Sequence, residues 1–342
     1  MSFENSNKTK FKFKEYISEK AESLGSSYQF DCYSDKNGEV ILIMVYFDIE
    51  HVGDRIHDIL LIALNDNKVI KKLEDHKDRV ISVRYFQEPN SKKDYLISVD
   101  RMQIVIVWDL NDFCKIFEIK MKYNSFIYSS LLISYSNNIY AVISTLGGGS
   151  TKIINLKDKS KSIDINNTYN LPVYFLSYWY NKKSNQLIII QCGKKIILMT
   201  EFPNNIVYDI LNSDEKYPYN LSGLVFTNEE RNLLAVSATF GLITIYDLEQ
   251  KKIMLKIMID NVFLYNFIKW NDNYLFVLDC SNKKIINFNI KDNEFKQEDE
   301  IELPELNHDR FIKKVNHPKY GESLLTIGID WKIKLFVIPK NN

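Results

Sequence analysis

Short stretches rich in β-branched and aromatic residues alternate with polar, turn-forming segments along most of the chain. The clearest group has four such stretches, at residues 79–83, 95–98, 104–109 and 115–119. Each is too short for a stable helix and has the composition of a β-strand. Only residues 16–23 have a spacing that could suit a helix. The pattern therefore predicts an all-β protein built from units of four short strands.

The same unit recurs along the sequence. Its third stretch carries a large apolar or aromatic residue near its end, at Ile62, Trp108, Ile154, Met199, Tyr246, Phe288 and Phe336. These seven positions are separated by 42 to 48 residues, a range that differences in turn length can produce. Four strands in each period of this length are typical of a propeller blade. The sequence predicts a seven-bladed β-propeller of four-stranded antiparallel blades.

Three residues mark the limits of the second unit. His76 precedes its first strand, and Trp108 and Asp109 close its third. Together with the period, this placement resembles the WD-repeat (WD40) β-propeller family, with the chain as a divergent member. The resemblance implies a buried hydrogen-bonded set formed by a His, a Ser or Thr, an Asp six residues before the Trp, and the Trp itself.

The set departs from the family pattern in the two units that come nearest to it. In the second unit Asp100 is displaced by two positions, so the sequence leaves open whether its carboxylate joins the set. In the last unit His308 and Asp330 are present, but Phe336 stands where the family has Trp. Because a phenylalanine ring has no hydrogen-bond donor, the set is expected to be incomplete there.

The ring has to be closed by a strand from the other end of the sequence. The seventh unit supplies three strands, and residues 10–16 are left over before the first unit. Lys and Phe alternate over residues 10–14, as expected for an outermost strand. We therefore expect residues 10–16 to pair with the strand around Phe336, within a single propeller of residues 10–342 that follows a tail of residues 1–9.

Charge and composition exclude several classes of protein. The 44 basic and 44 acidic residues cancel, so no overall field attracts nucleic acid. The longest apolar run, residues 40–47, is too short to span a membrane, and residues 1–10 lack the core of a signal peptide. The cysteines are too far apart to form a zinc motif or a disulfide framework: Cys32, Cys114, Cys192 and Cys280. We expect a cytoplasmic protein, with a nuclear location left open.

No catalytic set can be assembled from the five histidines, so we expect neither an enzyme nor a bound cofactor. One alternative is a metal-dependent or enzymatic propeller that uses His51 and His57, which share a loop rich in carboxylates. Their spacing matches no ligand motif, and a solvated polar loop is the better interpretation. No metal site is therefore predicted.

A second alternative is a phosphoinositide-binding propeller. That function uses an Arg-Arg-Gly motif, because adjacent guanidinium groups suit phosphate. The six arginines of this chain are all separated in sequence: Arg55, Arg79, Arg84, Arg101, Arg231 and Arg310. The missing motif argues against lipid recognition without excluding it.

The loops that lead into the innermost strands should lie together on one face around the central channel. Tyr and Arg recur near these loops, and both are frequent anchors of protein interfaces. The candidate partner-binding residues are Lys77, Asp78, Arg79, Arg101, Tyr123, Tyr169, Tyr217, Tyr219, Asp309 and Arg310. They could also serve only to pack one blade against the next. We interpret the chain as a non-catalytic scaffold that binds a protein or peptide through this face, alone or within a larger complex.

Overall fold

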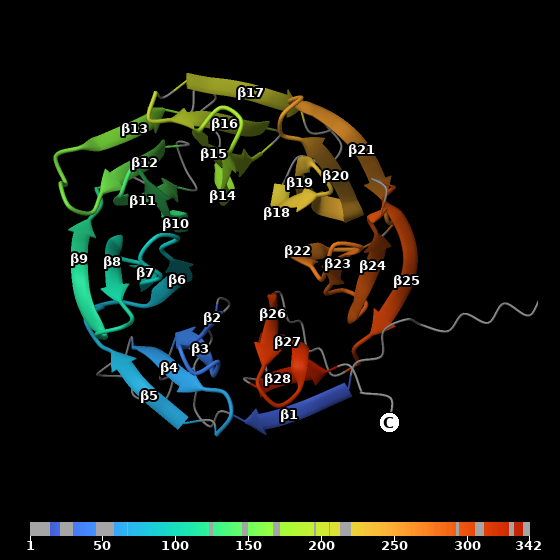
Figure 1. The fold of residues 1–342 in the computed structure, drawn as a ribbon, viewed down its shortest axis with the longest axis horizontal. Coiled ribbons are helices and arrows are strands. Elements are labelled where there is room, and N and C mark those ends of the chain that lie inside the picture. The colour runs from blue at the N-terminus through green and yellow to red at the C-terminus, as the bar shows by residue number, and fades with distance from the viewer. Residues whose placement is uncertain are drawn as a thin grey trace, which may run out of the picture.

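Seven four-stranded antiparallel sheets form a ring around a central axis (Figure 1). The computed structural model describes residues 14–20, 30–45, 58–66, 68–122, 126–145, 150–166, 172–194, 196–204, 206–212, 220–260, 262–291, 294–304, 311–327 and 332–337. The arrangement confirms the predicted seven-bladed propeller. Among the described residues, no helix has the length and apolar character that crossing a membrane requires.

The first three complete blades follow one another in sequence, and in each of them the innermost strand comes first. Blade one contains β2 (Phe30–Ser34), β3 (Val40–Val45), β4 (Ile59–Ala63) and β5 (Lys68–Leu73). Blade two contains β6 (Val80–Gln87), β7 (Asp94–Asp100), β8 (Ile104–Asp109) and β9 (Cys114–Lys120). Blade three contains β10 (Ile127–Tyr135), β11 (Asn138–Thr145), β12 (Ser150–Asn155) and β13 (Ser162–Asn166).

The next three blades have the same strand order. Blade four contains β14 (Val173–Asn181), β15 (Gln186–Gly193), β16 (Ile196–Phe202) and β17 (Ile206–Asn212). Blade five contains β18 (Asn220–Asn228), β19 (Arg231–Ala238), the short 3-10 helix η1 (Thr239–Gly241), β20 (Leu242–Asp247) and β21 (Lys252–Met258). Blade six contains β22 (Leu264–Lys269), β23 (Tyr274–Asp279), β24 (Lys284–Asn289) and β25 (Lys296–Glu302).

Blade seven combines strands from both ends of the sequence. Its inner strands are β26 (Ile312–His317), β27 (Gly321–Ile327) and β28 (Lys332–Val337), and β1 (Lys14–Lys20) is the outermost. In the antiparallel pairing of β1 with β28, Glu15 lies opposite Phe336. The described part of the closing strand covers residues 14–20 and overlaps the predicted segment at residues 14–16. Residues 10–13 lie outside the described part of the chain.

The helix considered for residues 16–23 is wrong over the described part of that segment. Residues 16–20 belong to β1, where the backbone pairs with β28. Local spacing could not show this, because the partner strand is more than 300 residues away in sequence. The free edge of β28 takes up the segment as a strand, and tertiary context overrides a weak local preference.

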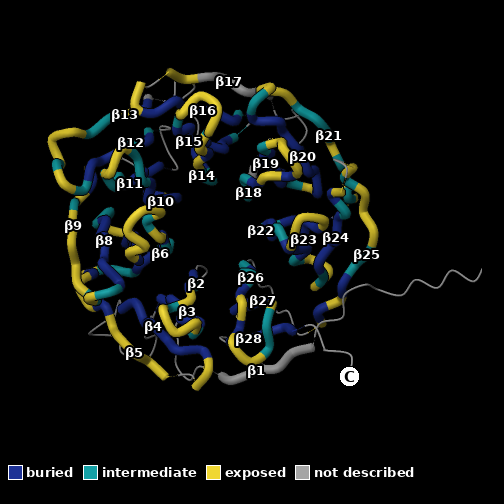
Figure 2. The backbone as a smooth tube through the Cα atoms, viewed as in Figure 1, coloured by how far each residue is buried: buried dark blue, intermediate teal, exposed yellow. Residues whose placement is uncertain are grey.

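The hydrophobic core lies between blades. Each of seven clusters of buried side chains draws its members from two neighbouring blades, so every interface in the ring has one. In β3, Val40, Leu42 and Met44 pack toward blade seven, whereas Ile41, Ile43 and Val45 pack toward blade two. Both faces of the strand are buried, which is why the middle strands are continuously apolar (Figure 2).

The residues that defined the sequence period occupy equivalent places. All seven are buried and belong to the third strand of their blade. Each lies opposite an apolar residue of the second strand, as in the pairs of Leu96 with Trp108 and of Leu324 with Phe336. The period therefore records one repeated packing position at the interface between blades.

Candidate functional site

One face of the ring carries two kinds of loop. Successive antiparallel strands run in opposite directions, so alternate loops emerge at the same end of a blade. The loop that leads into the innermost strand therefore shares a face with the loop that joins the second and third strands. In blade two these loops touch, because the Arg101 amide donates to the Arg79 carbonyl at 3.0 Å. We call this side of the ring the loop face.

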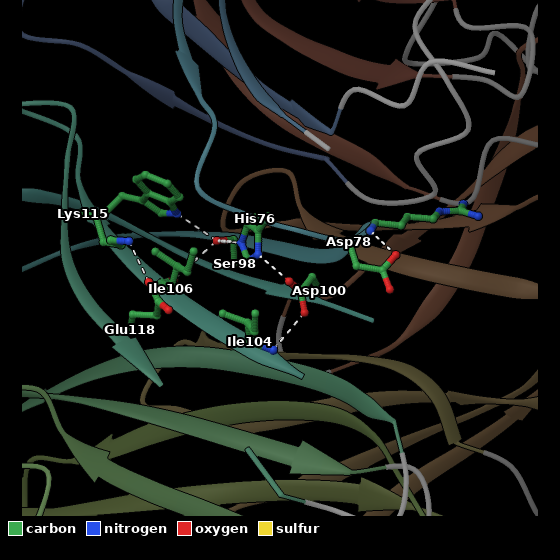
Figure 3. A network of polar contacts seen from close by, with 10 residues as sticks. His76, Asp78, Ser98, Asp100, Ile104, Ile106, Lys115 and Glu118 are labelled. Atoms are coloured by element: carbon green, nitrogen blue, oxygen red, sulfur yellow. Dashed lines mark hydrogen bonds and ion pairs between the residues drawn. The ribbon is translucent and has the colours of Figure 1, made fainter. Parts of the chain in front are cut away.

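A buried chain of polar contacts lies beneath the loop face in blade two (Figure 3). Trp108 Nε1 donates to Ser98 Oγ at 2.8 Å, and Ser98 Oγ lies 2.7 Å from His76 Nε2. His76 Nδ1 lies 3.0 Å from the Asp100 carboxylate, which also accepts the Ile104 amide at 2.9 Å. A neutral imidazole protonated at Nδ1 would donate to Asp100 and accept from Ser98. Each of the four side chains in this series of contacts thus has a hydrogen-bond partner.

The structure shows that the displaced Asp100 does join the set. Asp100 is the last residue of β7, and its backbone pairs with Val80 at the start of β6. The turn that follows is tight: the Gln103 amide donates to the Asp100 carbonyl at 3.1 Å, and Gln103 has a positive φ of 64°. The number of residues between Asp100 and Trp108 does not predict this contact. The carboxylate of Asp100 is oriented by its position at the end of β7.

The other residues assigned to the repeat have separate roles. The Asp109 carboxylate accepts the Asn111 amide at 2.8 Å and stabilises the turn between β8 and β9. Phe336 is buried in the cluster between blades six and seven. His308 and Asp330 lie outside the described residues.

The structure brings together the four candidate residues of blade two. His76 is buried and immediately precedes them, so it fixes the start of the loop. Asp78 accepts the Arg79 amide at 2.6 Å, and the Arg79 carbonyl receives the Arg101 amide. Lys77 and Arg101 are exposed, whereas Asp78 and Arg79 are half-buried. The result is a group of charged residues on two loops that a backbone hydrogen bond joins.

The remaining candidate residues lie outside the part of the chain that the structure describes. They are Tyr123, Tyr169, Tyr217, Tyr219, Asp309 and Arg310. The same holds for His51 and His57 of the loop considered for metal binding. Among the described residues, no group of three or more His, Cys, Asp or Glu side chains is placed to hold a metal ion.

In the part of the chain that the structure describes, the loops of only one face expose large apolar side chains. Met102, Phe126, Phe240 and Phe263 are each about half exposed, from 47% to 56%, and all four belong to loops of the loop face. Within the described ranges, no loop of the opposite face exposes a large apolar side chain. None of these four residues was a candidate from the sequence. Their positions between predicted strands were the one available signal, and that signal does not show which loop side chains are exposed.

Two of these aromatic rings form a pair between blades five and six. The centroids of Phe240 and Phe263 are 6.3 Å apart, with the rings tilted by 41°. Phe240 has a positive φ of 63°, which is costly for a bulky residue. Gly241 follows with a φ of 85°, and a Cβ there would lie 1.9 Å from the Ile259 carbonyl oxygen. Gly241 therefore permits the close approach of this loop to Ile259, and the adjacent Phe240 is exposed.

Two of the thiols are poorly suited to nucleophilic chemistry. Burial raises the pKa of Cys32 to about 12, with a further contribution from Asp31. Burial also raises the pKa of Cys192. Since the thiolate is the reactive form, both cysteines are unreactive at neutral pH.

Comparisons with known proteins identify the fold. No protein-family model and no curated protein matches the chain. Two crystal structures of BBS1N in complex with ARL6DN are similar to this chain. The structure soaked with mercury has a TM-score of 0.70 and a sequence identity of 10%, and the match covers 97% of this chain and 98% of the other. The structure soaked with lead has a TM-score of 0.69 and a sequence identity of 11%, and the match covers 96% of this chain and 98% of the other.

A third similar structure is the β-propeller domain of Cps50 (Swd1) from Myceliophteria thermophila. Its TM-score is 0.64, with 13% identity over 95% of this chain and 100% of that chain. At these levels of identity the likeness concerns the fold alone. It agrees with the seven-bladed ring that the strand order shows.

Proposed function

We propose that this propeller is a non-catalytic scaffold that binds a protein or peptide through its loop face. The observation that carries the proposal is that, among the described residues, exposed large apolar loop side chains are found on that face alone. Aromatic residues and Met are enriched at the centres of protein interfaces, because they bury large areas on binding. Exposed rings that touch each other supply such an anchor.

The charged cluster of blade two would add specificity. Lys77 and Arg101 are exposed beside Met102, so a partner can meet an apolar contact and a basic group on the same blade. Charges at the edge of an interface orient a partner more than they strengthen its binding. The net charge of zero argues for a protein ligand over nucleic acid, because it provides no general attraction for phosphate.

The finer parts of the proposal come from the sequence. Tyr123, Tyr169, Tyr217, Tyr219, Asp309 and Arg310 would extend the same face around the ring. We further propose that the chain is a divergent WD-repeat propeller of the cytoplasm. The contacts that join Trp108, Ser98, His76 and Asp100 support that relationship, since they reproduce the set that the resemblance implies.

The similar structures support an interaction role at a coarse level. The BBS1N propeller was crystallised in complex with ARL6DN, a protein partner. A propeller offers a rigid ring on which loops of different sequence can be displayed, so one fold serves many partners. The identity of the partner must therefore be found from the face itself.

Affinity purification followed by mass spectrometry tests the proposal. The test variant carries Phe240→Asn and Phe263→Ser on the loop face, and the control carries Val69→Ser and Ile70→Ser on the outer strand β5. All four side chains are between 40% and 56% exposed in the wild type. Partners that bind the wild type and the control but not the test variant support the loop face. Partners that the control loses and the test variant keeps would place the interface on the outer strands.

A further inference from the structure

The innermost strands of the ring carry an excess of positive charge. Over β2, β6, β10, β14, β18, β22 and β26, the described strands that surround the axis, Asp31 is the sole carboxylate. The same strands carry four cations: Arg84, Lys269, Lys313 and Lys314. Eight tyrosines also belong to these strands, and the hydroxyls of two of them, Tyr85 and Tyr180, already donate to Asp94 and Asn185.

Three of the four cations have a carboxylate partner. Lys269 Nζ lies 2.8 Å from Asp272, and Lys314 contacts Glu322. Lys313 Nζ lies 3.2 Å from Asp31. The Asp31 carboxylate also accepts the amides of Cys32 at 2.9 Å and Tyr85 at 3.0 Å. The sole carboxylate of the inner strands is therefore already well satisfied.

Arg84 is the cation that remains. Its guanidinium donates to the Leu176 carbonyl of blade four at 3.1 Å. No carboxylate of the described residues lies within ion-pair distance of it, although Asp31 is near enough for a longer-range attraction. Burial lowers the pKa of Arg84, yet a guanidinium stays charged in proteins. A partly buried charge without a counterion is costly, and a bound anion would offset that cost.

We propose that the axis of the ring binds a carboxylate group at Arg84. One uncompensated positive charge matches a singly charged anion, and the planar guanidinium fork matches a carboxylate. Tyr178 interacts electrostatically with Arg84, and 38% of its surface is exposed, so solvent reaches this part of the axis. Its hydroxyl would donate to the second oxygen of the ligand.

Carboxylates reach such a site from two sources, a small organic acid or a Glu or Asp side chain of a protein partner. The inference does not depend on the proposed loop-face interaction, because Arg84 and Tyr178 belong to inner strands. If the loop face proves not to be an interface, Arg84 keeps its uncompensated charge. The experiment below uses the purified protein with small probes and needs no partner.

NMR of arginine side chains tests the site directly, because the chain has only six arginines. The Arg84 Nε–Hε signal is assigned by its loss in Arg84→Lys. Four probes are titrated at equal ionic strength: sodium acetate, an acetylated and amidated Gly-Glu-Gly peptide, sodium phosphate and sodium chloride. Arg231, which is exposed at the start of β19, is the matched control. We expect a saturable shift of the Arg84 signal with a carboxylate, and none at Arg231.

The probes also distinguish the sources. Saturation by acetate but not by the peptide would support a small organic acid, and tighter binding of the peptide would support a protein side chain. Tyr178→Phe should weaken binding by about threefold to tenfold, which corresponds to the loss of one hydrogen bond. The proposal is overturned if neither carboxylate shifts Arg84, if Arg231 responds equally, or if phosphate or chloride saturates the signal at the same concentration. None of these outcomes depends on whether a variant without the positive charge of Arg84 can fold.

Discussion

Lys313 of blade seven forms an ion pair with Asp31 of blade one, with Nζ and Oδ1 3.2 Å apart. The pair belongs to a series of polar contacts between inner strands. Asp31 also accepts the Tyr85 amide of blade two, and Arg84 of blade two donates to Leu176 of blade four. Asn266 of blade six donates to Ser222 Oγ of blade five and to the Ile312 carbonyl of blade seven. The blades are thus joined by polar contacts at the axis as well as by apolar packing.

The Asp31→Asn substitution tests the importance of this inner series. It removes the sole carboxylate of the described inner strands while keeping the size of the side chain, so Lys313 and Arg84 lose their nearest negative charge. We expect the free energy of unfolding to fall by about 1–3 kcal/mol. Urea denaturation measures it. Asp158→Asn, which removes an exposed charge paired with Lys161, should change stability much less, because solvent screens an exposed ion pair.

The Trp108→Phe substitution tests the polar chain of blade two. The ring still fills the core, but the donation from Nε1 to Ser98 Oγ is lost from a buried site. We expect a loss of about 1–2 kcal/mol in the free energy of unfolding. The double variant with Ser98→Ala should lose less than the sum of the two single variants, because both remove the same hydrogen bond. Strict additivity would show that the contact contributes little.

His317 should make stability depend on pH. Burial, together with Lys319, lowers its pKa in the folded protein below that of the unfolded chain. The unfolded chain then binds the proton more readily, so this contribution is complete above about pH 6.5 and is lost as the pH falls toward the lowered pKa. His317→Asn keeps an acceptor for the Lys319 amide, which now donates to Nδ1 at 3.1 Å.

Thermal unfolding of both proteins between pH 8 and pH 5 measures the effect of His317. The wild type should lose more stability than His317→Asn as the medium is acidified, since other groups titrate equally in the two. Parallel curves would mean that His317 does not contribute to the pH dependence.

Phe240 should be dispensable for folding. The Phe240→Asn substitution places a residue that tolerates positive φ at this turn and removes an exposed ring. Relief of backbone strain offsets the lost contact with Phe263, so we expect the free energy of unfolding to stay within about 1 kcal/mol of the wild type. Urea denaturation checks this independently of any binding assay.

Gly241→Ala is the contrasting variant at the same turn. A Cβ at Gly241 would lie 1.9 Å from the Ile259 carbonyl oxygen, and the backbone also has a positive φ there. This variant should be clearly less stable than Phe240→Asn. If Gly241→Ala and Phe240→Asn were equally stable, the loop would have to move to accommodate the added Cβ, and Phe240 would not be held in place.

The closing strand can be tested by deletion of residues 1–20. Without β1, the outer edge of β28 loses its antiparallel partner and blade seven keeps three strands. We expect a sharply lower melting temperature, because the ring depends on blade seven to join blades six and one. An unchanged melting temperature would contradict a stabilising role for β1. Circular dichroism at a strand-sensitive wavelength follows the transition.

The sequence by itself determined the number and order of the blades. Middle strands are buried on both faces between neighbours, so each leaves a short, continuously apolar run, and the seven runs that contain Trp108 and its equivalents repeat at a regular interval. This signal is local, since it needs only the composition and spacing of each stretch. The placement of His76 and Trp108 in one blade could be read in the same way.

Tertiary structure alone decided which polar and aromatic side chains meet. Arg84 reaches a carbonyl 92 residues away, and Phe240 meets Phe263 across a boundary between blades. Asp100 joins His76 because the end of a strand orients its carboxylate. Such contacts depend on how blades are placed around the ring, and strand periodicity carries no information about which loop residues face one another. The fold was therefore predictable from spacing, whereas the loop face and the axis required the positions of side chains in space.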